Sequence, residues 1–220
     1  MAEYFDINIV IEYMPYFLKG ALLTIGVSIV GILFGCILGM FIGMGKMIKK
    51  WYFNFPFVWY INFFRGTPLI VQLFLFHFAV LPAMFDSVSA TTSLMVTLSL
   101  NSAAYVAEIF RAGIKSLDRG QAEAARSLGM SKIQVMRYVV LPQAFKRMIP
   151  PLGNEFIVLL KDSALGAMIA APELFYWGRA AVGEYYRVWE AYIMVALFYL
   201  VLTLSLTYLL NYLERRLDTE

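Results

Sequence analysis

Residues 121–142, QAEAARSLGMSKIQVMRYVVLP, form a polar, charged insert between long apolar segments. The residues before Gly129 favour helix, and Gly129 suits the left-handed conformation that commonly ends one. Ser131 and Gln134 have the spacing of a capping box, which starts a new helix. Because proline disrupts a helix interior, Pro142 is predicted to end this second helix. The insert is therefore predicted to be two short helices joined by a bend, although local chemistry equally allows a solvated loop.

The composition around this insert indicates a protein that crosses a membrane several times. The 220 residues are 61% hydrophobic and 15% charged, whereas soluble domains are about half apolar. The net charge of +3 does not indicate nucleic-acid binding, because the basic residues gather at segment ends, as in membrane proteins. Cys36 is the only cysteine, so an internal disulfide is excluded. The N-terminus lacks the basic start of a signal peptide, and we expect the first span to direct insertion.

Long apolar segments predict an all-α membrane protein with about five transmembrane helices. A span needs about 20 apolar residues. Five segments qualify: residues 17–44, 58–81, 92–114, 150–170 and 188–212. Residues 51–57 are aromatic and are predicted to lie at the membrane interface, and residues 172–187 are predicted to form a short interfacial helix on the outer side. Pro68 is predicted to kink or start a helix within the second segment.

Lysine and arginine residues predict the orientation of these spans. They follow the first span, cluster between the third and fourth spans, and follow the fifth. The positive-inside rule therefore places the N-terminus outside and the C-terminus in the cytoplasm. The insert at residues 121–142 is then cytoplasmic.

A row of glycines marks one face of the first span. Gly31, Gly35, Gly39 and Gly43 recur every four residues, which allows close approach of another helix backbone. This ridge serves either packing within one subunit, which we favour, or a dimer interface.

The fourth predicted span carries polar and charged residues on one face. At about 100° per residue, Asn154, Glu155, Lys161 and Asp162 fall within about one third of the helix circumference. Each charge at mid-membrane costs at least about 2.5 kcal/mol, and such residues are usually functional. Lys161 suits a carboxylate, and Glu155 or Asp162 suits an ammonium group, a pairing that fits a zwitterionic amino acid. The alternative is charge neutralisation between helices.

The third predicted span also carries polar residues. Asn101 and Ser102 lie near its middle, where they are predicted to hydrogen-bond a substrate. The alternative is polar packing between helices, worth about 0.6 kcal/mol on average. Glu108 lies closer to the cytoplasm and is expected to pair with Arg111. His77, in an aromatic run, is assigned no role.

Several stretches resemble one family of transporters. Glu123-Ala124-Ala125, Gly129 and Leu141-Pro142 have the spacing of the EAA signature of permease subunits in ATP-binding-cassette (ABC) importers, with Val139 where isoleucine is usual. RGTPLIVQL, NSAAYVAEIFRAGI and GNEFIVLLKDSAL resemble the polar amino acid uptake permeases of the histidine, glutamine, arginine and cystine type. The resemblance covers nearly the whole chain.

This resemblance implies a single transmembrane permease domain, residues 1–220, with the type I ABC importer fold and a cytoplasmic coupling loop at about residues 118–145. The loop would couple to two ATPase subunits, and transport would proceed by alternating access. Further implied partners are a second permease subunit, identical or a close paralogue, an extracytoplasmic solute-binding protein, membrane lipid and a polar amino acid. The implied location is the bacterial cytoplasmic membrane. Coupling residues would be Glu123, Ala124, Ala125, Gly129, Leu141 and Pro142. Pocket residues would be Asn101, Ser102, Glu155, Lys161 and Asp162.

The chain is not expected to be an enzyme or to hold a cofactor or metal. Its GMFIGMGK stretch lacks phosphate-loop spacing, so ATP and Mg²⁺ are expected on the partner ATPase. An alternative function is an ion-coupled secondary amino acid transporter, but such folds usually contain internal repeats and we find none. An intramembrane enzyme or receptor is a third class. Serines are present in the spans, but no histidine or aspartate lies in a matching span to activate a serine as a nucleophile.

Overall fold

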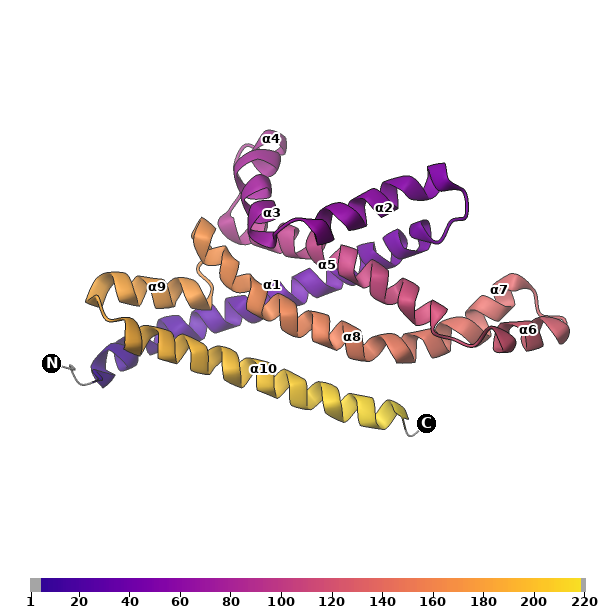
Figure 1. The fold of residues 1–220 in the computed structure, drawn as a ribbon. Helices are drawn as coiled ribbons and strands as arrows, with labels where there is room; N and C mark the ends of the chain where they lie inside the picture. Colours follow the sequence, from indigo (N-terminus) through magenta and orange to yellow (C-terminus); the bar gives the residue numbers. More distant parts are fainter. Residues whose placement is uncertain (1–4, 219–220) are drawn as a thin grey trace.

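A computed structural model describes residues 5–218 of the chain, and all regular structure within that range is helical. Figure 1 shows the helices running largely along one long axis, with the short helices α6 and α7 at one end and α9 at the other. The helices in chain order are α1 (Ile7–Lys46), α2 (Trp51–Gly66), α3 (Leu69–Leu75), η1 (Phe76–Val80), α4 (Leu81–Met84), α5 (Ala90–Lys115), α6 (Arg119–Ser127), α7 (Lys132–Gln134), η2 (Val135–Val140), α8 (Leu141–Asp162), η3 (Ser163–Ile169), α9 (Leu174–Tyr185) and α10 (Val188–Asp218).

Three described helices, α1, α5 and α10, are long and apolar enough to cross a membrane. A fourth crossing is present if the bent pair Trp51–Gly66 and Leu69–Met84 counts as one span. Helix α8 is 22 residues long but does not meet the same criterion, in keeping with the charged side chains that it carries. Helix α1 is longer than the predicted first span, because Asp6 caps it by accepting a hydrogen bond from the backbone N–H of Asn8 at 3.0 Å.

The glycine ridge of α1 packs against α5 of the same subunit, which confirms the favoured interpretation. A Cβ atom added at Gly35 would lie 2.8 Å from the Cβ atom of Ser102. One added at Gly39 would lie 2.6 Å from the Cβ atom of Val106 and 2.8 Å from the Ala103 carbonyl oxygen. The absence of side chains on this ridge is therefore what lets the two helices approach so closely.

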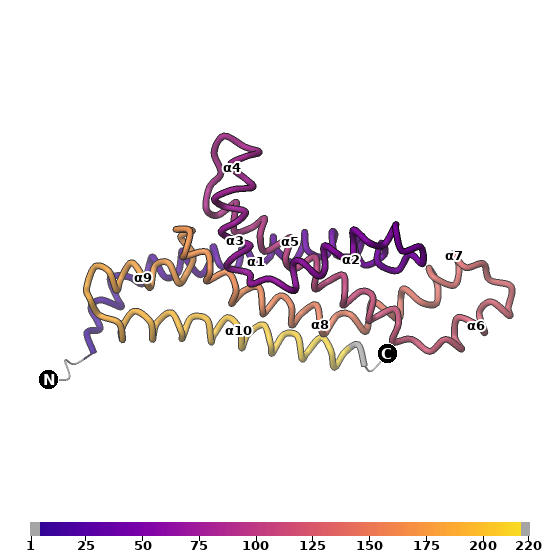
Figure 2. The backbone as a smooth tube through the Cα atoms, turned by 45° about the horizontal axis from the view of Figure 1, so that its top comes forward, coloured from indigo at the N-terminus to yellow at the C-terminus, as the bar shows by residue number. Residues whose placement is uncertain are grey.

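The second predicted span is not one continuous helix. Helix α2 ends at Gly66, and α3 begins at Leu69 after a bend of 109°. Pro68 caps α3, so the prediction that it kinks or starts a helix within the segment at residues 58–81 is confirmed. Gln72 secures the bend, since its Nε2 donates to the carbonyl oxygens of Phe64 at 2.9 Å and Thr67 at 3.0 Å. Figure 2 shows α3 and α4 projecting away from the remaining helices.

The insert begins as predicted but ends differently. Gly129 has a left-handed φ of +84° and separates α6 from α7, and Ser131 and Gln134 form the capping box. Pro142, however, does not end the second helix. It lies in the first turn of α8, which follows directly from the π-helix η2, so the chain is helical from Lys132 to Asp162. A π-helical turn shifts the hydrogen bonds from the i→i−4 to the i→i−5 pattern, and Pro142, which has no N–H, lies where the two patterns meet.

The fourth predicted span, residues 150–170, is corrected at both ends. Helix α8 starts nine residues earlier, at Leu141, and ends at Asp162. The chain continues as the 3₁₀ helix η3 to Ile169, and Ala170 then reverses it with a left-handed φ of 60°. The charged pair Lys161 and Asp162 therefore lies at a junction between two helix types and not in the middle of a regular helix.

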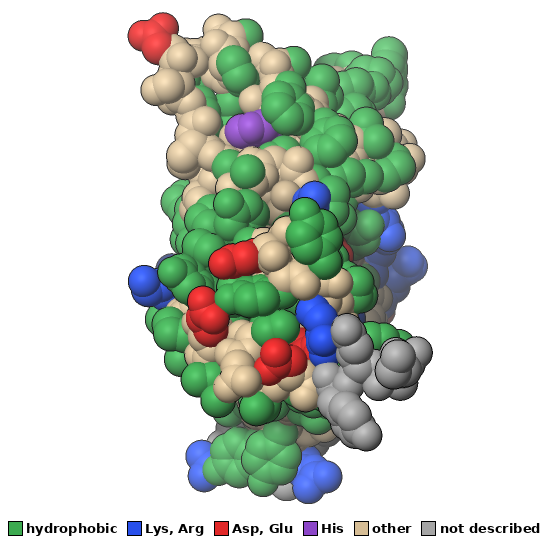
Figure 3. Space-filling model, turned by 90° about the vertical axis from the view of Figure 1, so that its left-hand side faces the viewer, with side chains coloured by type: hydrophobic (Ala, Val, Ile, Leu, Met, Phe, Trp, Pro, Cys, Tyr) green, Lys and Arg blue, Asp and Glu red, His purple; other side chains and the backbone are tan. Residues whose placement is uncertain are grey.

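A buried carboxylate joins the helices at the end opposite the insert. Glu173 is fully buried and caps α9, the helix predicted for residues 172–187, by accepting from the backbone N–H groups of Phe175 at 2.8 Å and Tyr176 at 2.7 Å. It also accepts from the Tyr199 hydroxyl of α10 at 2.9 Å. Figure 3 views the molecule from this end, where hydrophobic side chains are interspersed with acidic and basic ones.

Candidate functional site

Two of the predicted pocket residues meet at a buried point between α5 and α8. Glu155 of α8 is 8% exposed, and its carboxyl group faces Ser102 of α5. Ser102 is fully buried, and its hydroxyl makes no well-formed hydrogen bond to any described residue. Buried polar atoms usually have partners, and the carboxyl group of Glu155 is the group that faces this hydroxyl. Gly35 makes room for it on the α1 side.

Lys161 and Asp162 lie at the end of α8, one turn or more beyond Glu155. Lys161 is exposed, and Asp162 is half-buried beside it. Asn154 is exposed as well. The four polar residues of α8 thus divide into an exposed pair, Asn154 and Lys161, and a more buried acidic pair, Glu155 and Asp162.

Asn101 lies in a different cluster from Ser102. Its Nδ2 donates to Oε1 of Gln72 at 2.9 Å and to the Phe64 carbonyl oxygen at 3.3 Å. These bonds tie α5 to the bend between α2 and α3. In this structure the Asn101 amide therefore makes the interhelical contacts that the sequence offered as the alternative to substrate binding.

The exposed residues of α8 form a row that continues toward the insert. Arg147, Pro151, Asn154 and Lys161 are all exposed, and their spacing of four, three and seven residues keeps them on one helix face. Helix α5 has a comparable row, in which Tyr105, Ala112 and Ser116 are exposed and Glu108 is half-buried. At the insert end of the molecule, Arg147 and Pro151 of α8 line one groove together with Glu108, Ala112 and Ser116 of α5.

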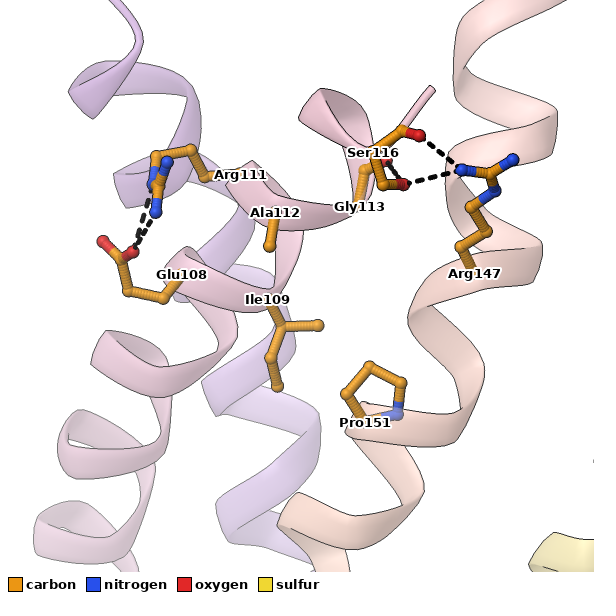
Figure 4. A pocket seen from close by; sticks show the side chains of 8 residues that line it. All are labelled: Glu108, Ile109, Arg111, Ala112, Gly113, Ser116, Arg147 and Pro151. Atoms are coloured by element: carbon orange, nitrogen blue, oxygen red, sulfur yellow. Dashed lines mark hydrogen bonds and ion pairs between the residues drawn. The ribbon is translucent and has the colours of Figure 1, made fainter. Parts of the chain in front are cut away.

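A cavity of about 500 Å³ opens in this groove. Figure 4 shows Ile109 and Pro151 on facing sides of the space between α5 and α8, with Arg147 reaching toward Ser116. Arg111 forms the predicted ion pair with Glu108, with nitrogen–oxygen distances of 3.0 and 2.7 Å, and Lys46 of α1 pairs with the same carboxylate. The sequence analysis missed Arg147 and Ser116 as groove residues. The seven-residue spacing from Arg147 to Asn154 was the signal for the first.

The insert presents a second candidate surface. Glu123 and Ala124 are exposed on α6, whereas Ala125 faces inward at 6% exposure. Leu128 and Ile133, on either side of the bend, are 85% and 79% exposed. Large apolar side chains this exposed at a projecting tip (Figure 1) are typical of a surface that docks a partner protein. Gly129 makes the bend; Leu141 and Pro142 join the insert to α8.

Comparison with known proteins identifies the family. Residues 31–219 match the family described as binding-protein-dependent transport system inner membrane component. The chain belongs to this family. The glutamine transport system permease protein GlnP of Escherichia coli is 37% identical over 215 residues, covering 97% of this chain and 98% of the relative.

Solved structures agree with this family assignment. A crystal structure of an amino acid ABC transporter with histidines is 40% identical, with a TM-score of 0.91, covering 97% of this chain and 100% of that chain. An inward-facing structure of the MetNI methionine ABC transporter matches with a TM-score of 0.80 at 20% identity, covering 94% and 98% of the two chains, and shows the shared fold.

The chain is therefore a membrane-embedded permease subunit of an ABC importer, with the type I fold that its resemblance implied. Neither the family nor the matched structures lend support to the ion-coupled alternative. The roles of the individual pocket and coupling residues stay predictions.

Proposed function

We propose that this permease subunit carries a polar amino acid across the bacterial cytoplasmic membrane, driven by partner ATPase subunits. The observation that carries the proposal is the uninterrupted helical path from Lys132 to Asp162. Its first end belongs to the insert, and its last turn holds Lys161 and Asp162. A movement of the insert is thereby transmitted along this continuous helical segment to the charged residues that are predicted to bind the substrate.

The charged residues at the end of α8 indicate the class of substrate. Lys161 is exposed and suits a carboxylate, while the acidic groups of Glu155 and Asp162 suit an ammonium group. Charge-assisted hydrogen bonds of both signs are what a zwitterionic amino acid requires. The relative GlnP is a glutamine permease by name, which agrees with a polar amino acid.

The coupling surface is the tip of the insert. Exposed Leu128 and Ile133 offer apolar anchors, and Glu123 offers a charge beside them. Basic residues at this end of the bundle support a cytoplasmic location by the positive-inside rule, with the N-terminus outside. The complete importer comprises two permease subunits, two ATPase subunits that bind ATP and Mg²⁺, and an extracytoplasmic solute-binding protein.

Substitution of Glu123 tests the proposed coupling. Glu123→Ala is expected to abolish ATP-dependent amino acid uptake by the reconstituted complex while membrane insertion stays intact. Glu214→Ala, a carboxylate removed from the same predicted side of the membrane but outside the insert, is the matched control and is expected to retain uptake. Uptake by the permease without any ATPase would overturn the proposal.

A further inference from the structure

The cavity between α5 and α8 at the insert end has no assigned role. We propose that it is a release-side subsite, in which Arg147 binds the carboxylate of the amino acid as it leaves toward the cytoplasm. The inference rests on the proposed transport function, and it adds a second binding position to the pathway, separate from Glu155, Lys161 and Asp162.

The cavity favours an anion because its cations outnumber its carboxylates. Among the described residues that line it, Glu108 is the only acidic one, and that carboxylate is already paired with both Arg111 and Lys46. Arg147 is left without a carboxylate partner among the described residues. Its hydrogen bonds to the carbonyl oxygen and hydroxyl of Ser116 are both donated by Nη1. Nε and Nη2 therefore remain for a ligand, and a guanidinium group suits a carboxylate particularly well.

The walls of the cavity strengthen that attraction. Ile109, Ala112, Gly113 and Pro151 contribute apolar surface, and Figure 4 shows them between the two arginines. A low local dielectric makes a charge-assisted hydrogen bond stronger than it is in water. The volume of about 500 Å³ lies within the usual range of small-molecule sites.

The position of the cavity favours an amino acid over a lipid headgroup, whose phosphate offers similar chemistry. Arg147 and Pro151 belong to the same exposed row of α8 as Asn154 and Lys161. Fourteen residues separate Arg147 from Lys161, which is about 21 Å along a helix. A carboxylate released by Lys161 thus meets a second cation farther along the same face, nearer the cytoplasm.

Inhibition by internal substrate tests the subsite in the complete complex. Proteoliposomes would enclose MgATP and increasing unlabelled L-glutamine, with binding protein and labelled L-glutamine outside. Arg147→Ala is expected to raise the internal concentration that halves the initial uptake rate by about tenfold or more, since tenfold corresponds to about 1.4 kcal/mol, near the lower end for a hydrogen bond to a charged group. Arg147→Lys is expected to fall between this variant and the unmodified chain.

Two further variants keep the test decisive. Ala112→Leu fills the cavity without removing a charge and is expected to raise the half-inhibiting concentration as well. Lys49→Ala removes a cation outside the cavity at the same end of the molecule and is expected to leave the half-inhibiting concentration unchanged. Equal half-inhibiting concentrations for Arg147→Ala, Ala112→Leu and the unmodified complex would overturn the subsite while leaving transport established. An Arg147 effect that appears only when phosphatidylglycerol is added to phosphatidylcholine vesicles would assign the cavity to lipid instead. If the unmodified complex shows no ATP-driven uptake of any amino acid in a panel of labelled amino acids, the proposed function itself would be overturned.

Discussion

Gly39 offers a sharp test of the packing between α1 and α5. In Gly39→Ala, the new Cβ atom would lie 2.6 Å from the Cβ atom of Val106 and 2.8 Å from the Ala103 carbonyl oxygen. Neither neighbour is the end of a flexible side chain, so the helices must move apart. Overpacking of this kind costs about 1–3 kcal/mol.

Gly26→Ala on the same helix is the matched control. A Cβ atom there has no neighbour within 4 Å, and the gain in helix propensity, about 0.5–1 kcal/mol, is the same for both substitutions. That gain cancels in the comparison, so the free energies of unfolding of the two variants should differ by about 1–3 kcal/mol, the overpacking cost alone.

Unfolding by sodium dodecyl sulfate in mixed micelles, followed by circular dichroism, measures this difference. We expect Gly39→Ala to unfold at clearly lower detergent fraction than Gly26→Ala. Equal unfolding midpoints would refute the close approach of α1 and α5, and would favour the alternative that the ridge serves contact with a second subunit.

Two other substitutions probe the exposed cation Lys161 and the buried carboxylate Glu173. Lys161→Ala is expected to weaken amino acid uptake while ATPase docking, measured by co-purification, survives, because only the exposed cation is removed; wild-type uptake kinetics would refute its role. Glu173→Gln is expected to destabilise the chain by about 1–3 kcal/mol in the same micelle assay, because an amide cannot accept from all three of the N–H and hydroxyl donors that the carboxylate serves. An unchanged unfolding midpoint would show that these bonds contribute no net stability.

The local signals in the sequence predicted local structure well. The capping box at Ser131, the left-handed Gly129 and the helix start at Pro68 each depend on a few neighbouring residues, and each is found as expected. The glycine ridge was also informative, because a four-residue repeat of glycine along a span fixes which face approaches another backbone.

Features set by the wider structure escaped prediction. Pro142 was expected to end a helix, but the π-helix η2 before it changes the hydrogen-bond ladder so that the helix continues through the proline. The change to a 3₁₀ helix begins at Ser163, three residues before Gly166, so no glycine or proline stands at the point of change. Ala170 takes the left-handed conformation that usually belongs to glycine.

The candidate site was predicted in outline only. The polar residues of α8 were recognised because charges are costly within an apolar segment. The hydrogen bond from Asn101 to Gln72 depends on the sharp bend between α2 and α3. The angle of that bend cannot be predicted from the pattern of apolar residues. Arg147 was counted as one of many cytoplasmic cations, because its seven-residue spacing from Asn154 indicates a shared helix face but not the groove beside α5.

The central claim is ATP-driven amino acid import, and uptake into proteoliposomes tests it most directly. The chain would be reconstituted with its ATPase and binding protein and offered a panel of labelled amino acids. The account predicts that one class of polar amino acid accumulates only when MgATP is present. ATP hydrolysis by the complete complex without accumulation of any amino acid, or accumulation that needs no ATPase, would contradict it.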